Sequence, residues 1–243
     1  MAAVKAADTP FGQELEVFRK EQETAQQYFF AYLAIRAAAA GDEKVLAFLN
    51  TNPMFWVTTH HALLLAAFVA LGRVFDQNSR HNLDRVMKAA TDDLSLFSRA
   101  VLAQRKEEEG LTRAQAAVYV SDAYEATAAD FRSLRKEIAE RRRAYEARYR
   151  DVRDKIFAHN EISDTSDANA LLAKTNIEEM KGIFGFLHAL NDAMWELLYN
   201  GRKPDLSIQD FVLPPADPAQ GRSMKPGEKI AREARAFLDA ARG

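Results

Sequence analysis

The sequence contains no cysteine, and it has only 10 glycines and 7 prolines among 243 residues. Without thiols the chain cannot form disulfides, zinc ribbons or iron–sulfur clusters, and it has no cysteine nucleophile. A cysteine-free composition favours a cytoplasmic protein. The first ten residues also lack the apolar stretch of a signal peptide, which agrees with that expectation.

Long hydrophobic runs are also lacking. The longest one, from Ala62 to Gly72, covers about half of the roughly 20 residues that a membrane span requires. His60 and His61 stand at its start. We therefore expect a buried core helix here, and no membrane association.

What the sequence does contain favours helices. Alanine, leucine, glutamate, lysine and arginine dominate, and runs of β-branched residues are nearly absent, so we expect an all-α fold with a sizeable core. We predict a flexible N-terminus at residues 1–10, a helical bundle at 11–200, and an irregular proline-containing tail at 201–243 that ends in a short helix. No phosphate-binding glycine loop, nucleophile elbow or metal-ligand motif is present, so neither a metal nor a cofactor is expected.

Apolar spacing and turn residues predict where the helices lie. Gly41, Asn52-Pro53, Asn78-Ser79 and Gly110 interrupt the pattern, and Asn200-Gly201 ends its last strong stretch. The predicted helices span about residues 11–40, 45–49, 54–76, 82–90, 92–106, 111–158 with a kink near Thr127, 176–199 and 226–241.

The predicted helix at 111–158 would approach 70 Å if it were straight, which is long for one globular domain. Between Asp130 and Lys155 it carries ten basic and six acidic residues, a local net charge of +4 in a chain of net charge −2. At about 100° per residue, six arginines share an arc of about 100°. They are Arg132, Arg135, Arg142, Arg143, Arg150 and Arg153. An apolar stripe runs beside them: Phe131, Leu134, Ile138, Tyr145, Tyr149, Val152 and Ile156.

Two interpretations of this basic face stand side by side. A phosphate backbone would be attracted to such a row of arginines. Alternatively, the row is an ordinary solvated helix face whose arginines pair with glutamates one turn away. Charge alone does not decide between them.

The end of the basic helix adds a chemical signal. Arg153 can hold a phosphate with two hydrogen bonds and a permanent charge, and His159 can exchange a proton near neutral pH. Cleavage of RNA by its own 2′-hydroxyl needs these two roles and no metal.

Arg153, Asp154, four further residues and His159 resemble the signature of the HEPN superfamily, an arginine followed after four to six residues by a histidine. The polar residue directly after the arginine also fits. This stretch is similar to the Arg-Asp-Lys…Ala-His element of the abortive-infection AbiU branch of that superfamily. Residues Leu71–Asp76 (LGRVFD) resemble a Leu-x-Arg-Leu-Phe-Asp stretch of the same branch. The resemblance covers about residues 12–200.

The resemblance implies a helical bundle that forms a homodimer with the two motifs facing each other, and an endoribonuclease that leaves a 2′,3′-cyclic phosphate. By this analogy His159 is the acid/base, Arg153 stabilises the phosphate, Asp154 orients one of them, and Asn160 contacts backbone or phosphate. RNA and an antitoxin or another defence protein are the expected partners. A related branch has a modified tyrosine where this chain has Glu161, so neutralisation by tyrosine modification is not expected.

Helix geometry limits how this motif can work. Residues six apart in an unbroken helix lie about 120° apart around the axis and about 9 Å apart along it, too far to address one phosphate from one rigid face. Either the helix ends near Ala158, or the working pair comes from two chains. The polar run after Asn160 favours the first option, and the two are compatible.

The other titratable residues point to structural roles. His60 and His61 point about 100° apart on their helix and cannot form a metal site by themselves. Asp92-Asp93 is better explained as a helix cap than as a metal ligand pair. Asp76 fits either a bond to a nearby arginine or a supporting role for His159. We expect His81 at the surface and His188 on the last bundle helix.

Two functions from different classes therefore stand open. The first is a HEPN-type ribonuclease in phage defence or a toxin. The second is a catalytically silent HEPN-like bundle that binds RNA or a partner protein.

Overall fold

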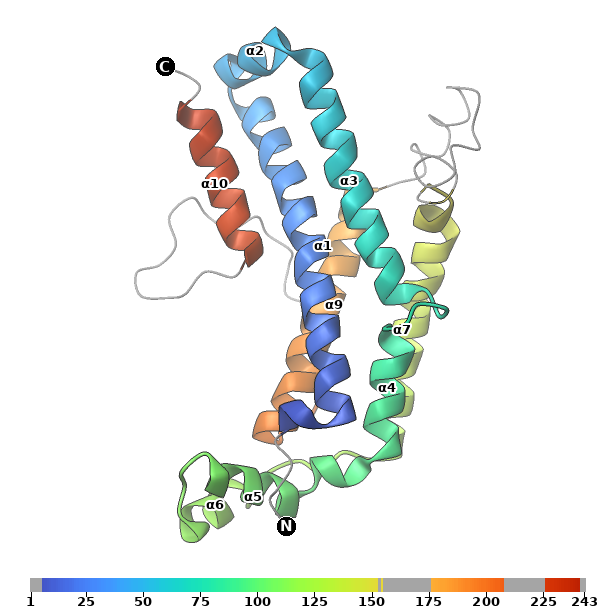
Figure 1. Ribbon diagram of the computed structural model, residues 1–243, viewed down its shortest axis with the longest axis vertical. Coiled ribbons are helices and arrows are strands. Elements are labelled where there is room, and N and C mark those ends of the chain that lie inside the picture. Colours follow the sequence, from blue (N-terminus) through green and yellow to red (C-terminus); the bar gives the residue numbers. More distant parts are fainter. Residues whose placement is uncertain (1–5, 153, 155–175, 208–225, 241–243) are drawn as a thin grey trace. The chain divides into compact units, whose positions relative to one another are not determined.

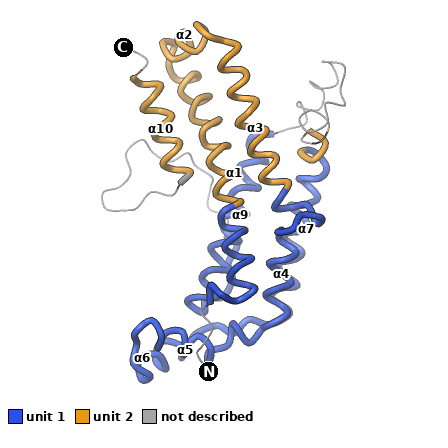
Figure 2. The backbone as a smooth tube through the Cα atoms, in the orientation of Figure 1, with its two compact units in different colours: residues 1–20, 73–148, 175–210 blue, residues 21–72, 149–174, 211–243 orange. Residues whose placement is uncertain are grey.

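The computed structural model describes residues 6–152, 154, 176–207 and 226–240 (Figure 1). All regular structure in these ranges is helical, which confirms the predicted all-α class. The chain divides into two compact units (Figure 2). Unit 1 comprises residues 1–20, 73–148 and 175–210, and unit 2 comprises residues 21–72, 149–174 and 211–243.

Most predicted helices are found within a few residues of their expected bounds, because capping residues mark them in the sequence. The side chains of Asp42, Asn82 and Asn176 each accept a hydrogen bond from a backbone N–H in the first turn of the helix that follows. The helices are α1 (Pro10–Gly41), α2 (Glu43–Thr51), α3 (Pro53–Phe75), α4 (Leu83–Asp92), α9 (Ile177–Asn200) and α10 (Pro226–Ala240).

Gly201 ends α9 in the left-handed conformation, with φ at +61°. Only glycine adopts this conformation without strain. The position is also crowded, since a Cβ atom there would lie 2.7 Å from Leu102 Cδ2 and 2.8 Å from the Cβ atom of Ala123. The predicted cap at Asn200-Gly201 is thus confirmed, and it is also a close packing contact within unit 1.

The predicted continuous helix at 92–106 is wrong. The Asp93 carboxylate accepts the backbone N–H of Ser95, which starts a 3₁₀ turn, η2 (Leu94–Phe97). Ser98 then caps a separate helix, α5 (Arg99–Glu108), through the backbone N–H of Val101. The prediction of Asp93 as a cap is confirmed. The second cap, Ser98, was not predicted.

The helix predicted at 111–158 is broken rather than kinked near Thr127, and residues 155–158 lie outside the described residues. Its first part is a short helix, α6 (Arg113–Tyr119), and a new helix, α7 (Ala128–Tyr145), begins after an irregular segment. The Asp130 carboxylate accepts hydrogen bonds from the backbone N–H and hydroxyl of Thr127, at 2.8 and 2.7 Å, and so fixes the start of α7. Tyr124 N–H donates to the Gly201 carbonyl at 2.7 Å, which holds the irregular segment against the end of α9.

Within unit 1, α4 lies alongside α7 (Figure 1). Aromatic rings form much of the core of unit 1. Phe97 has its ring centroid 5.2 Å from those of both Phe11 and Phe131, and the ring of Phe75 stacks on Tyr145 at 5.3 Å. Such pairs add about 0.5–1.5 kcal/mol each beyond the burial of their area.

Unit 2 contains the terminal helix α10 that the tail was predicted to form. Ala231 packs with Phe30 and Ala34 of α1, and Leu238 packs in a second cluster with Val45 and Leu49 of α2.

The apolar run Ala62–Gly72 of α3, predicted as a buried core helix, is buried mainly in its second half, and the turns of α3 before it are mostly exposed. Residues Ala67 and Phe68 of unit 2 are buried, whereas Met54 is 76% exposed and Phe55 is 63% exposed. Of the described helices, α3 is the one with the length and composition of a membrane span, and 22% of the relevant stretch is buried. The early turns carry large apolar side chains that the described residues leave uncovered.

Candidate functional site

An apolar stripe fixes the orientation of the basic helix. Six members of the predicted stripe are at most 5% exposed, and the seventh, Ile156, lies outside the described residues. The six are Phe131, Leu134, Ile138, Tyr145, Tyr149 and Val152. Since these side chains set which way the helix faces, they also decide which arginines can reach solvent.

A π-helical segment, η3 (Glu146–Arg150), follows α7 directly. Segments of this kind are rare and often mark functional sites, because an extra residue in the turn redirects the side chains after it. The projection at 100° per residue therefore applies strictly to α7 and not to the residues beyond Tyr145. The sequence showed no signal for this segment.

Two arginines of the basic face hold α4 against α7. Arg142 donates from Nε to the Phe75 carbonyl at 3.1 Å and from Nη2 to Asp84 at 2.7 Å, and its side chain is only 11% exposed. Arg135 donates from Nη2 to the carbonyl of Met87, at 3.1 Å. These guanidinium groups tie α7 to the end of α3 and to the middle of α4, so they act as structural groups.

Two further arginines of this helix, which the sequence pattern did not single out, contact α9. The guanidinium of Arg141 lies 5.3 Å from the ring centroid of Phe186, and Arg148 Nη1 lies 2.6 Å from Glu179 Oε1. Much of the local positive charge therefore serves packing between helices.

Arg132 and Arg143 remain exposed, and neither makes an ion pair or hydrogen bond within the part of the chain that the structure describes. Arg150 Nε lies 3.7 Å from Asp154 Oδ2, one helical turn away. The side chain of Asp154 is 33% exposed. The carboxylate expected to orient Arg153 or His159 is thus within reach of Arg150.

Three of the predicted site residues, Arg153, His159 and Asn160, lie outside the described residues. Asp154 lies four residues beyond the end of the π-helical segment, and Arg132 and Arg143 are exposed on α7.

The remaining histidines have structural neighbours. The ring of His60 meets Tyr32 edge-on at 5.5 Å, and burial, followed by the charge of Arg36, lowers the pKa of His60. His81 Nδ1 lies 3.1 Å from Glu14, and His188 Nε2 lies 3.3 Å from Asp192. No group of three or more histidine, aspartate or glutamate side chains is placed to hold a metal ion within the described ranges.

Asp76 also has a local role, because its Oδ1 accepts the backbone N–H of Asn78 at 3.0 Å. The Asn82 amide then donates to the carbonyls of Asp76, Gln77 and Ser79, at 3.0–3.1 Å. These bonds shape the tight connection between α3 and α4.

Comparison with known proteins places this helical arrangement in the HEPN class. The match to the HEPN family AbiU2 covers residues 8–212, most of the chain. The chain belongs to the AbiU2 family. Neither a curated protein nor a solved structure is significantly similar to it.

Proposed function

We propose that this protein is a metal-independent endoribonuclease that acts in phage defence or as a toxin. Membership of the AbiU2 family carries the proposal, because the family match spans the segment from Arg153 to His159 where the two groups required for RNA cleavage lie. The π-helical segment that ends at Arg150, four residues before Asp154, supports it, since such segments are frequent at functional sites.

The proposed reaction uses the RNA's own 2′-hydroxyl. His159 takes part in moving the proton from the 2′-oxygen, which bonds to phosphorus, and in delivering a proton to the 5′-oxygen, whose bond to phosphorus breaks. Arg153 stabilises the charge that grows on the non-bridging phosphate oxygens. Asp154 orients one of the two groups. The products are a 2′,3′-cyclic phosphate and a free 5′-hydroxyl.

We assign RNA binding chiefly to Arg132 and Arg143, with Arg150 and Asn160 nearer the motif. Arg132 and Arg143 are exposed and make no ion pair within the described part of the chain, so a phosphate backbone can approach them. Contacts of this kind read no base, and we expect little sequence preference from them.

The protein is proposed to work as a homodimer. Two residues six apart on one helix reach a single phosphate poorly, and pairing two chains offers Arg153 of one copy and His159 of the other. Light scattering is expected to give twice the mass of one 27.3 kDa chain at micromolar concentration. A strict monomer would remove the two-chain cleft.

The experiment that tests the function compares two RNA oligonucleotides of one sequence, one unmodified and one with 2′-O-methyl groups throughout. The purified protein is expected to cleave the first and not the second, because the methyl group blocks the attacking oxygen. Both should bind, since phosphates dominate the contacts. Binding of both without cleavage of either would favour the alternative, a catalytically silent RNA-binding module.

A further inference from the structure

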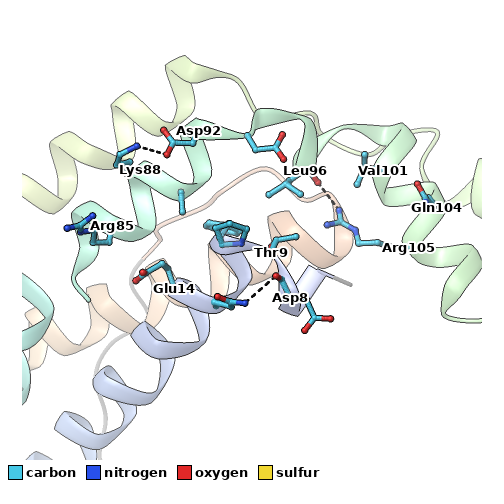
Figure 3. Close-up of a pocket in the computed structure, with 15 residues that line it drawn as sticks. Asp8, Thr9, Glu14, Arg85, Lys88, Asp92, Leu96, Val101, Gln104 and Arg105 are labelled. Carbon is cyan, nitrogen blue, oxygen red and sulfur yellow. Dashed lines mark hydrogen bonds and ion pairs between the residues drawn. The ribbon is translucent and has the colours of Figure 1, made fainter. Parts of the chain in front are cut away.

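Unit 1 contains a pocket of about 630 Å³ whose lining includes none of the residues proposed to bind RNA (Figure 3). The start of α1, α4, η2 and α5 supply its walls. The volume falls within the range typical of sites for small molecules, about 300–1,000 Å³. Pro10, Phe11, Leu96 and Val101 give it an apolar lining, and Phe11 is held rigidly by its edge-on contact with Phe97.

One wall of the pocket carries a buried cation whose hydrogen bonds are incomplete. Arg105 is 8% exposed, and Nη2 donates to the Leu96 carbonyl at 2.9 Å. Its Nε and Nη1 atoms are buried without a hydrogen-bond partner. Figure 3 shows the guanidinium directed from α5 toward Leu96 and the pocket. A guanidinium has five N–H donors, and leaving donors of a charged group unmet in the interior is unfavourable.

The acidic residues around the pocket are mostly engaged elsewhere. Lys88 lies 2.5 Å from Asp92, Asp93 accepts from Ser95, and Glu14 contacts His81. Glu109 is close enough to Arg105 for their charges to attract, but its carboxylate forms an ion pair with Lys106 at 2.7 Å. Hence no carboxylate hydrogen-bonds the guanidinium of Arg105 in the described structure.

We propose that this pocket binds a small molecule that carries a carboxylate or phosphate group on an apolar body, with Arg105 as its oxyanion partner. Because Nε and Nη1 are buried, binding requires the guanidinium to turn so that these donors face the pocket that Arg105 lines. A planar guanidinium suits both oxyanions, because it offers parallel N–H donors. The apolar body packs against Pro10, Leu96 and Val101. Arg85 is exposed and lines the pocket on the side opposite Arg105, where it adds positive charge (Figure 3).

Calorimetric titration of the full chain with three compounds tests the proposal. They are phenyl phosphate, benzoate and the neutral benzyl alcohol. At least one of the two anions should bind, and benzyl alcohol at least about tenfold more weakly, since the charge-assisted hydrogen bonds are lost. The tighter of the two anions identifies the headgroup. Failure of both anions to bind at millimolar concentration overturns the proposal, as does equal binding of benzyl alcohol.

Matched variants locate the binding. Arg105→Met fills similar space without charge and should weaken anion binding at least about tenfold, whereas Arg105→Lys should recover part of it. Arg113→Met removes an exposed arginine on α6 and should leave binding unchanged. Urea unfolding of each variant checks that it is folded. Unchanged binding by folded Arg105→Met places the anion elsewhere and contradicts the proposal. The readout is binding without RNA, so the result is independent of the proposed ribonuclease activity.

Discussion

Replacement of His159 by alanine is expected to reduce RNA cleavage by about 100-fold or more while RNA binding stays nearly intact. The reason is that a general acid–base group contributes about 10²–10⁴-fold to rate and little to ground-state binding of a phosphate. Cleavage of a labelled RNA under single-turnover conditions measures the first effect, and filter binding measures the second. His188→Ala is a matched control, because His188 contacts Asp192 within α9 and has no role in the proposed chemistry.

Arg153 should behave differently from His159. Arg153→Ala is expected to weaken both binding and cleavage, since one guanidinium would hold the phosphate in the ground state and in the transition state. Arg153→Lys should recover only part of the activity, because a point charge cannot reproduce two parallel hydrogen bonds. Cleavage by His159→Ala at the wild-type rate would refute these roles.

Arg142→Glu and Arg143→Glu are expected to separate folding from RNA binding, although the two arginines are neighbours in the sequence. Arg142 is 11% exposed and bonds to Phe75 and Asp84, so a glutamate there loses both bonds and faces a carboxylate. Since the Asp84 side chain is 44% exposed, solvent screens the pair, and loss of the ion pair and the carbonyl bond together is expected to destabilise by about 1–3 kcal/mol. Arg143 is exposed, and its replacement should change stability by no more than about 0.5 kcal/mol.

Urea unfolding measures the stability of both variants, and RNA binding at several salt concentrations measures their charge contacts. Arg143→Glu should bind unrelated RNAs more weakly and show a shallower salt dependence. Equal stability of the two variants would contradict the structural role of Arg142. If Arg143→Glu leaves the salt dependence of RNA binding unchanged, Arg143 belongs to an ordinary solvated helix face and does not bind RNA.

Local signals made most of the helices predictable. Asn176 and Gly201 bound α9 because an asparagine cap and a left-handed glycine act within one turn of the helix. Ser98 and Thr127 act in the same way, yet they lie within segments whose composition is helical throughout, and their caps depend on Val101 and Asp130 folding back onto them. Composition therefore predicted longer helices than the side-chain hydrogen bonds permit.

The site was less predictable, because periodicity describes a helix without its neighbours. The projection placed Arg135, Arg142 and Arg143 on one side of the helix. It could not show that Arg135 bonds to the Met87 carbonyl of α4, or that Arg142 bonds to the Phe75 carbonyl and to Asp84. Arg105 gave no signal at all. It is followed by exposed glutamates in the sequence, and the packing of α5 against η2, α6 and α9 buries its side chain.

The central claim is that Arg153 and His159 cleave RNA without a metal ion. Its most direct measurement is the cleavage of unmodified RNA by the wild-type protein in excess EDTA, with the new 3′ end identified by mass spectrometry. The account predicts undiminished cleavage and a 2′,3′-cyclic phosphate, because the two side chains supply both the proton transfers and the positive charge. Loss of cleavage in EDTA with recovery on addition of a divalent cation would contradict it.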